Sequence, residues 1–184
     1  MTTINLPILR GSGFVLRPFR LNDAASLCEA MNDERVARKV THIPFPYTRE
    51  HADTWVHGMS DAFTPASRRV DFAIAEEDDD GGDIMGSVAF INVDGHKAQV
   101  SYWLTPAQWG RGVVPSALQQ LLTFGFDDMK LVRIFAYVYS ENKASARVLE
   151  KAGFAFEGTH RKEWCKVIDG VTCFFDSNYY AIVR

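Results

Sequence analysis

The chain has 184 residues, 47% of them hydrophobic and 12% aromatic, which is enough to bury one core of ordinary size. Its formal net charge is −3 at pH 7 and it has no basic run, which argues against a nucleic-acid partner. No apolar run approaches the ~20 residues of a membrane-spanning helix, and residues 1–10 lack the pattern of an export signal. We therefore expect a soluble, cytoplasmic protein with no membrane partner and one domain over residues 1–184.

The three cysteines give no sign of a metal centre or of a disulfide framework. Their number is odd, and their spacing matches neither a zinc site nor a Cys-x-x-Cys motif. We expect Cys28, Cys165 and Cys173 to be reduced structural thiols and expect no metal site.

Strand and helix signals alternate along the first part of the chain. Residues 14–19 predict a short strand, and Asn22 is a candidate N-cap for the helix that follows. A helical turn or two is expected within residues 33–40. Thr48 is the expected cap of a helix that runs to about Phe63.

A hairpin is expected next. Residues 70–75 alternate weakly as a strand, and the acidic, glycine-containing segment 76–83 is typical of a solvated turn between antiparallel strands. The strand-like runs 84–91 and 98–104 flank Asp94-Gly95, a dipeptide that favours a tight turn. These two runs should therefore pair with each other.

The remaining part of the sequence, from residue 115 onward, predicts a strand between two helices and then a closing hairpin. The expected elements are a helix at 115–128, a strand at 132–139, a helix at 143–152 and strands at 155–164 and 172–183. Gly153 suits a left-handed cap for the second helix, and Asp169-Gly170 suits the last turn. The alternation of elements predicts the α/β class.

A glycine loop lies between the strand ending near Leu104 and the helix beginning near Pro115. Its residues are Trp109, Gly110, Arg111, Gly112, Val113 and Val114. Glycines let successive N–H groups converge, and the N-terminus of a helix favours an anion, so a pyrophosphate would fit; a plain tight turn is the alternative. A dinucleotide fingerprint is excluded because Pro115 stands where its third glycine belongs, and a P-loop because its Gly-Lys-Ser/Thr ending is absent.

A second motif runs from Asn142 to Phe154, with Asn-x-x-Ser at its start and Leu-Glu-Lys-x-Gly-Phe at its end. The ordered set of motifs in this chain resembles the GNAT superfamily of N-acetyltransferases, and more narrowly the Rim-type ribosomal-protein N-terminal acetyltransferases. The motifs are Leu16-Arg17-Pro18, Tyr102-Trp103-Leu104, the glycine loop, the Asn142 segment and Phe156-Glu157-Gly158. The likeness covers nearly the whole chain and is strongest over residues 98–170.

The resemblance implies a fold and a cofactor. The fold is a mixed, mostly antiparallel sheet of about six to seven strands, flanked by helices, whose parallel strands 98–104 and 132–139 splay to admit acetyl-CoA. The glycine loop would bind pyrophosphate, and the backbone of Tyr102, Trp103 and Leu104 would pair with pantetheine. Asn142 and Ser145 would face the thioester, although Asn142 is also a good N-cap in its own right.

The implied reaction is direct attack of a neutral amine on the thioester. A backbone N–H near Leu104 would stabilise the oxyanion. Many relatives have a tyrosine as proton donor to the leaving thiolate, but Leu149 stands at that position here. Ser145 is therefore the expected donor, as in Rim-type members.

The sequence identifies the general base and the acetyl acceptor less specifically than the cofactor site. Gln99 stands where Rim-type relatives often carry glutamate, which leaves Glu163 as the first candidate, before His160 and His96. At pH 7 deprotonation costs about 1 kcal/mol for an α-amine and about 4.6 kcal/mol for a lysine, so a site without a strong base favours an α-amine. The expected acceptor is the N-terminus of a protein. A small amine or antibiotic, a non-catalytic acyl-CoA-binding module and a homodimer stay open.

Overall fold

The computed structural model describes residues 3–37, 43–59, 61–64, 66–77, 82–168 and 170–184. Its α-helices are α1 (Ala24–Met31), α2 (Glu34–Ala37), α3 (Arg49–His57), α4 (Val113–Thr123) and α5 (Lys143–Lys151). Its strands are β1 (Ile4–Asn5), β2 (Leu9–Arg10), β3 (Val15–Arg17), β4 (Ala62–Phe63), β5 (Val70–Ala75), β6 (Ile84–Asp94), β7 (Lys97–Leu104), β8 (Arg133–Tyr139), β9 (Ala155–Ile168) and β10 (Val171–Val183). The α/β class is confirmed.

A mixed sheet crosses the molecule in the order β2-β3-β5-β6-β7-β8-β10-β9, eight strands within the described residues. Only β7 and β8 run parallel in this sheet; the other described neighbours are antiparallel. Seven of the strands match the predicted ones. The eighth, β2, has two residues, too few to show a period-2 pattern.

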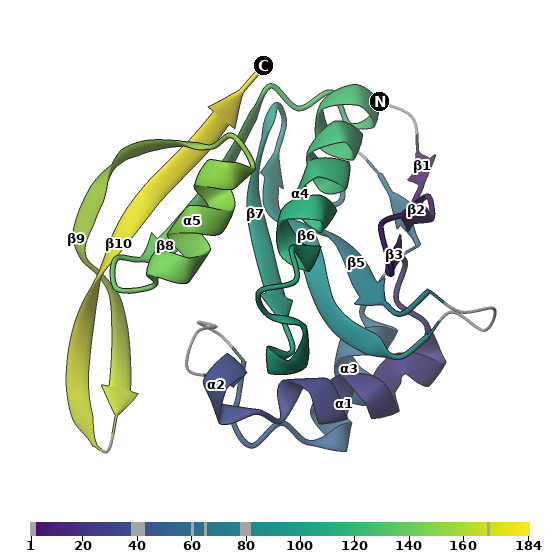
Figure 1. Cartoon of the computed structure of the whole chain (residues 1–184), viewed down its shortest axis with the longest axis horizontal. Coiled ribbons are helices and arrows are strands. Elements are labelled where there is room, and N and C mark those ends of the chain that lie inside the picture. Colours follow the sequence, from purple (N-terminus) through teal and green to yellow (C-terminus); the bar gives the residue numbers. More distant parts are fainter. Residues whose placement is uncertain (1–2, 38–42, 60, 65, 78–81, 169) are drawn as a thin grey trace.

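Helices pack on the sheet because each element has one apolar face. Buried positions alternate along β8, where Ile134, Ala136 and Val138 are covered while their neighbours are partly exposed. On the same side, α4 contributes Leu118 and Leu121, both fully buried, and each worth roughly 1.5–3 kcal/mol of hydrophobic stabilisation. The helices α4 and α5 lie in front of the sheet in Figure 1, and α1 to α3 lie at its lower end.

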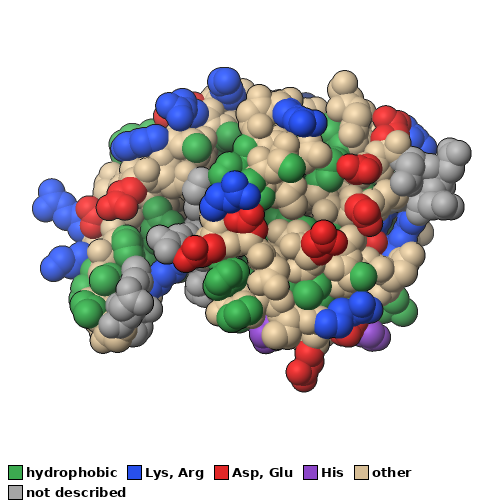
Figure 2. All heavy atoms as spheres, turned by 60° about the horizontal axis from the view of Figure 1, so that its bottom comes forward, with side chains coloured by type: hydrophobic (Ala, Val, Ile, Leu, Met, Phe, Trp, Pro, Cys, Tyr) green, Lys and Arg blue, Asp and Glu red, His purple; other side chains and the backbone are tan. Residues whose placement is uncertain are grey.

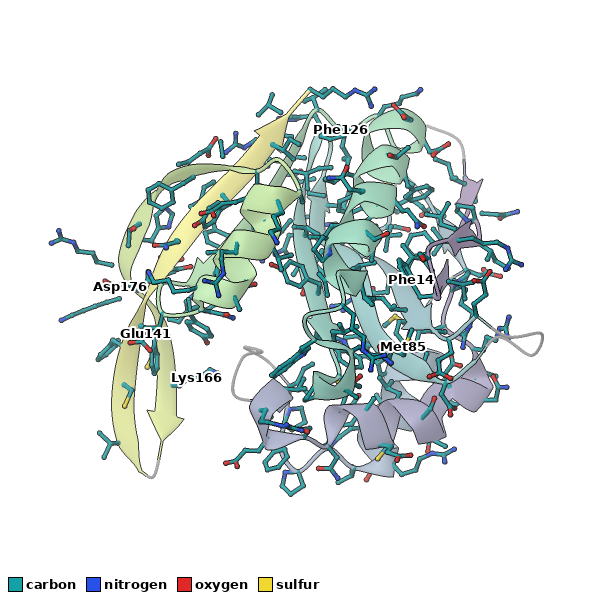
Figure 3. The ribbon with its side chains drawn as sticks, in the orientation of Figure 1. Phe14, Met85, Phe126, Glu141, Lys166 and Asp176 are labelled. Carbon is teal, nitrogen blue, oxygen red and sulfur yellow. The ribbon has the colours of Figure 1, made fainter. Side chains whose placement is uncertain are left out.

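A second group of buried side chains joins α1 and α3 to the sheet from its other side. Phe14 and Met85, labelled in Figure 3, belong to the main core under α4. The two groups keep α4 and α5 apart from α1 and α3.

Two predicted helix boundaries were wrong. Asn22 does not cap α1, because residues 21–23 form a 3-10 turn and α1 begins at Ala24. The helix capped by Thr48 ends at His57 instead of Phe63. Gly58 closes it by donating its N–H to carbonyls of the last turn, and Phe63 pairs with β1 in a separate small sheet.

Most predicted turns agree with the structure where it describes them. Gly95, at the predicted β6–β7 turn, has φ 59°, and Gly153 after α5 has φ 93°, so both positions are left-handed. The helix α4 begins at Val113, two residues before the predicted start, and continues into a π-helical turn at residues 124–128. Parts of three predictions lie outside the described residues: the helical turn beyond residue 37, the centre of the acidic turn at 78–81, and Asp169.

The parallel strands β7 and β8 separate after a short paired region. Lys97, Ala98 and Gln99 face Arg133, Ile134 and Phe135, and the two strands share no further register. Beyond that point β7 continues to Leu104 and β8 to Tyr139 without pairing with each other. Figure 1 shows the strands diverging, with the long β9–β10 hairpin projecting beyond them. The expected splayed pair is confirmed.

The surface gives little indication of a partner. Figure 2 shows Lys and Arg side chains interspersed with Asp and Glu over the face that carries α1 to α3, and apolar side chains on the projecting hairpin. Val171 and Phe174 are exposed there. Among the described residues, no helix is long and apolar enough to cross a membrane. All three cysteines are free.

Candidate active site

Two cavities meet where β7 and β8 diverge. The larger cavity, of about 560 Å³, lies on the side of the sheet that carries Ser87, Ser101 and Trp103. The smaller cavity, of about 420 Å³, lies between β7, the glycine loop, the first turn of α4 and one side of α5 along its length. Four residues line both: Tyr102, Trp103, Asn142 and Ser145. Molecules entering from opposite faces of the sheet would therefore meet at these side chains.

The glycine loop forms one end of the smaller cavity. Gly110 and Gly112 have φ 77° and 79°, values that side-chain-bearing residues rarely adopt, and these conformations turn the chain into α4. Within the described residues, no acceptor is found for the backbone N–H groups of Gly110, Arg111, Gly112, Val113 and Val114. Five consecutive unpaired donors at the start of a helix fit a pyrophosphate, so the loop suits the phosphates of acetyl-CoA.

Two basic side chains at the other wall of the smaller cavity were not predicted. Arg147 and Lys151 on α5 line it and are its only charged lining residues in the described part of the chain. Their i, i+4 spacing, which puts both on one helix face, was a signal in the sequence that could have identified them. Their charge complements the phosphates of the same cofactor.

Other predicted loop residues have different surroundings. Arg111 is exposed and is absent from the lining of the smaller cavity. Trp109 lines that cavity with 40% of its surface exposed, and its indole N–H donates to the Leu104 carbonyl over 2.8 Å. This bond ties the loop to the end of β7. The Leu104 backbone, expected near the thioester, is thereby held in place.

Asn142 has the capping role that its position suggested. Its side-chain oxygen accepts a hydrogen bond from the Ser145 N–H over 3.2 Å at the start of α5. The same residue lines both cavities. The cap therefore fixes the first turn of α5, and with it Ser145, at the point where the cavities meet.

The Ser145 hydroxyl has a partner that was not predicted. Its Oγ lies 2.6 Å from the Tyr102 hydroxyl oxygen, which also donates to the Ser145 carbonyl over 3.2 Å. Burial raises the pKa of Tyr102 to about 12, so the phenol is protonated at neutral pH. The two residues are 43 positions apart, so no local motif links them. The structure thus places a protonated phenol in hydrogen-bond contact with Ser145.

Aromatic and basic side chains surround the larger cavity. Its aromatic lining residues are Trp55, Tyr102, Trp103, Tyr137, Tyr139 and Trp164. Its charged lining residues are Arg68 and Arg69, and the described lining contains no carboxylate and no imidazole. Gln99 lines this cavity, and its side-chain oxygen accepts from the Asn92 amide over 3.0 Å. The position at which relatives often carry glutamate thus faces the cavity with a neutral side chain.

The three candidate bases lie outside this lining. His96 is exposed in the β6–β7 turn. Glu163, on β9, has 41% of its side chain exposed, and its carboxylate is 3.7 Å from His160 Nδ1. His160 packs edge-on against Tyr137, a lining residue whose pKa is raised by burial first and by Glu163 among other neighbours. Glu163 and His160 therefore lie at the border of the larger cavity through Tyr137, but neither is among the residues that line it beside Ser145.

Comparisons with known proteins agree with this geometry. A family model described as an acetyltransferase (GNAT) domain matches residues 14–155. The uncharacterised N-acetyltransferase p20 of Bacillus licheniformis is 29% identical over 149 residues, which cover 79% of this chain and 81% of that protein. A GNAT-family acetyltransferase from Bacillus anthracis has a similar structure, with a TM-score of 0.78, 25% identity and coverage of 96% and 98% of the two chains.

A Rim-type enzyme is also among the structural neighbours. RimL, the ribosomal L7/L12 α-N-protein acetyltransferase, solved in complex with coenzyme A, has a TM-score of 0.79 and 18% identity, and the match covers 96% of this chain and 98% of that one. At this identity the likeness shows the shared fold. The match to the family model covers most of the chain and includes both the glycine loop and the Asn142 motif. The chain therefore belongs to the GNAT family of acetyl-CoA-dependent N-acetyltransferases.

Proposed function

We propose that the protein transfers the acetyl group of acetyl-CoA to the N-terminal α-amine of a protein, by direct attack within a ternary complex. One observation carries the proposal: cavities on opposite faces of the sheet share Tyr102, Trp103, Asn142 and Ser145. In this arrangement the smaller cavity holds the donor and the larger cavity holds the acceptor. Neither needs to leave before the other binds, so a covalent acetyl-enzyme is unnecessary.

The smaller cavity provides groups for each part of the donor. The unpaired N–H groups of the glycine loop bind the pyrophosphate, and Arg147 and Lys151 on the other wall of the cavity add positive charge. The edge of β7 from Val100 to Leu104 faces the gap without a strand partner, so its backbone is free to pair with pantetheine amides. Bound acetyl-CoA supplies the activated thioester, and these contacts direct it toward Ser145.

Ser145 is the proposed proton donor to the leaving thiolate. Either hydroxyl of the 2.6 Å Tyr102–Ser145 pair can be the donor. In the proposed reacting state Tyr102 turns its single hydrogen from the Ser145 carbonyl to Ser145 Oγ, which frees the hydroxyl hydrogen of Ser145 to point into the gap. When the thiolate leaves, Ser145 gives this hydrogen to the sulfur and takes one from the protonated nitrogen of the tetrahedral intermediate. Tyr102 stays protonated at neutral pH, so both hydroxyls end the reaction as they began. Tyr102 is a positioning residue in this scheme, since Ser145 alone contacts the sulfur.

The α-amine is favoured because the described lining of the larger cavity holds no strong base. An α-amine loses its proton at pH 7 for about 1 kcal/mol, a cost that many α-amines meet without help. Glu163, at the border of the cavity beside Tyr137, is the proposed final acceptor of that proton. Its exposure suits release of the proton to solvent.

Thiol release provides the test. The protein is incubated with acetyl-CoA and two peptides of one sequence containing a single lysine, one with a free N-terminus and one with a formylated N-terminus. We expect CoA release with the free peptide, and mass spectrometry should place the acetyl group on the α-amine. Acetylation of the lysine in both peptides would contradict α-amine specificity. Saturable acetyl-CoA binding without release, across peptides and small amines, would instead show a non-catalytic binding module.

A further inference from the structure

We propose that the larger cavity selects N-termini with an acidic residue at the third or fourth position, and that Arg69 binds its carboxylate. The inference rests on the proposed function and adds an acceptor class to it. It starts from the charge of the cavity, where the described lining contains two arginines and no carboxylate. Lys166, labelled in Figure 3, adds a further positive charge, since its Nζ lies 5.2 Å from the ring centre of the lining residue Tyr139. A polycationic amine would meet like charges here.

Arg69 is held in one orientation. Its Nε and Nη2 donate to the Asp71 carboxylate over 2.5 and 2.8 Å, and its guanidinium lies over the Trp55 ring, 4.6 Å from the ring centre. The Asp71 side chain is only 3% exposed and does not line the cavity, whereas 42% of the Arg69 side chain is exposed. The larger cavity therefore meets the guanidinium and not the carboxylate behind it.

The remaining edge of Arg69 is free to bind. Among the described residues its Nη1 has no hydrogen-bond partner. Two Nη1 donors and the second Nη2 donor form the end of the guanidinium that matches a carboxylate or a phosphate bidentately. Because Asp71 and Trp55 already fix the side chain, little rotamer entropy is lost when that edge binds.

Two further donors in the wall lack partners. Trp55 Nε1 and the Tyr139 hydroxyl are buried and have no hydrogen bond in the described structure. Buried polar groups are nearly always paired in folded proteins, and both atoms are closed to solvent, so a ligand would bond to them only after these side chains turn toward the cavity. An acceptor-rich ligand such as an acidic peptide would supply the oxygen atoms.

The strand order gives the position of the acidic residue. Arg69 immediately precedes β5, and β6 lies between β5 and β7. Neighbouring strands are ~4.8 Å apart, so Arg69 starts roughly 10 Å across the sheet from β7. Val70 is level with Phe90 and Val100, so Arg69 also lies about 10 Å along the strand direction from Tyr102, which makes the path to the reacting amine about 14 Å. An extended peptide advances ~3.3–3.6 Å per residue, so about four residues span the path between the reacting amine and Arg69. A free amino acid would be too short to use both sites.

Matched peptides test the inference. Amidated peptides of one sequence carry glutamate or glutamine at position 2, 3, 4 or 6, and kcat/KM is measured for each with acetyl-CoA at saturation. We expect the glutamate peptide to be preferred by about tenfold or more at position 3 or 4, with no preference at position 6. A phosphoserine peptide at the preferred position should behave like glutamate, since it offers the same kind of acceptor oxygens.

Variants then assign the preference to Arg69. Arg69→Gln combined with Asp71→Asn removes the cation without leaving a buried carboxylate unpaired, and the glutamate-to-glutamine ratio should fall to about one. Arg69→Lys keeps the ion pair with Asp71 but has no second donor edge, so it should also lose most of the preference even if the double variant does not fold. Arg49→Gln is the matched control: Arg49, on α3, pairs with Asp53 and is absent from the cavity lining, so the preference should remain.

The outcomes separate the two proposals. Acetylation of all peptides with a ratio near one, or a preference for glutamine at every position, would overturn the acidic-acceptor inference and leave the proposed function intact. If no peptide is acetylated, the proposed function fails, and calorimetric titration of the CoA-loaded protein with both peptides decides the inference on its own. Equal affinities, or a preference retained in Arg69→Lys and in the double variant, would remove Arg69 from acceptor binding.

Discussion

Replacement of Ser145 by alanine separates a chemical role from a structural one. The change removes the 2.6 Å hydrogen bond to Tyr102, but the phenol still has the Ser145 carbonyl at 3.2 Å. Because no buried donor is left unpaired, the free energy of unfolding should fall by only about 1 kcal/mol. Loss of a proton donor typically lowers kcat by ~10²- to 10⁴-fold, equivalent to about 2.7–5.4 kcal/mol in the activation barrier. The kinetic effect should therefore clearly exceed the effect on stability.

For each variant we would measure kcat and KM with the best acceptor, the affinity for CoA by calorimetry, and the unfolding midpoint. Tyr102→Phe should lower kcat by about tenfold, because it removes one orienting hydrogen bond worth about 1.4 kcal/mol. The double variant should be no slower than Ser145→Ala, since two residues that act as a unit have non-additive effects. Wild-type kcat in Ser145→Ala would refute the proton-donor role, and fully additive losses would refute the coupling to Tyr102.

Three further predictions concern the loop, the cap and the pH profile. Acetyl-CoA at 100 times its Kd should increase the free energy of unfolding by about 2.7 kcal/mol. Gly112→Asp should abolish this increase, whereas Gly112→Asn should keep most of it, because asparagine is uncharged and tolerates the left-handed backbone. An equal loss of the increase in both variants would contradict an anion site. Asn142→Ala should lower the free energy of unfolding by about 1 kcal/mol, and an unchanged denaturation midpoint would show that the cap contributes nothing. For an α-amine acceptor kcat/KM should rise with pH through about 7.8, and no decline from Tyr102 ionisation should appear near pH 10, because burial raises the pKa of that phenol to about 12.

The sequence predicted those parts of the site that depend on neighbours along the chain. The glycine loop and the Asn142 cap each lie within one short segment, where residue type and backbone conformation are directly linked. Asn142 therefore shows the capping bond that its position favoured, and Gly112 turns the chain into α4 with φ 79°. The fold class could be predicted for the same reason, because in most elements the period-2 or helical pattern of apolar residues was long enough to distinguish a strand from a helix.

The contacts between distant segments could not be predicted in this way. The Tyr102–Ser145 bond depends on how β7 and α5 approach each other, which no spacing encodes. The orientation of Arg69 was missed as well, although its i, i+2 relation to Asp71 is the separation at which two residues of an extended chain share one face. Glu163 was selected by residue type and resemblance alone, and its place at the border of the larger cavity depends on how β9 pairs with β10.

The divergence of β7 and β8 creates two unpaired strand edges inside a sheet instead of at its rim. Exposed outer edges invite pairing with other chains and aggregation, and proteins commonly protect them. Here helices and neighbouring strands surround the inner edges, so only a thin, flexible molecule can reach them. The protein therefore gains a backbone template for its cofactor with little of the aggregation risk. Amide hydrogen exchange along residues 100–104 should accordingly slow when CoA binds, as if the sheet had gained a strand.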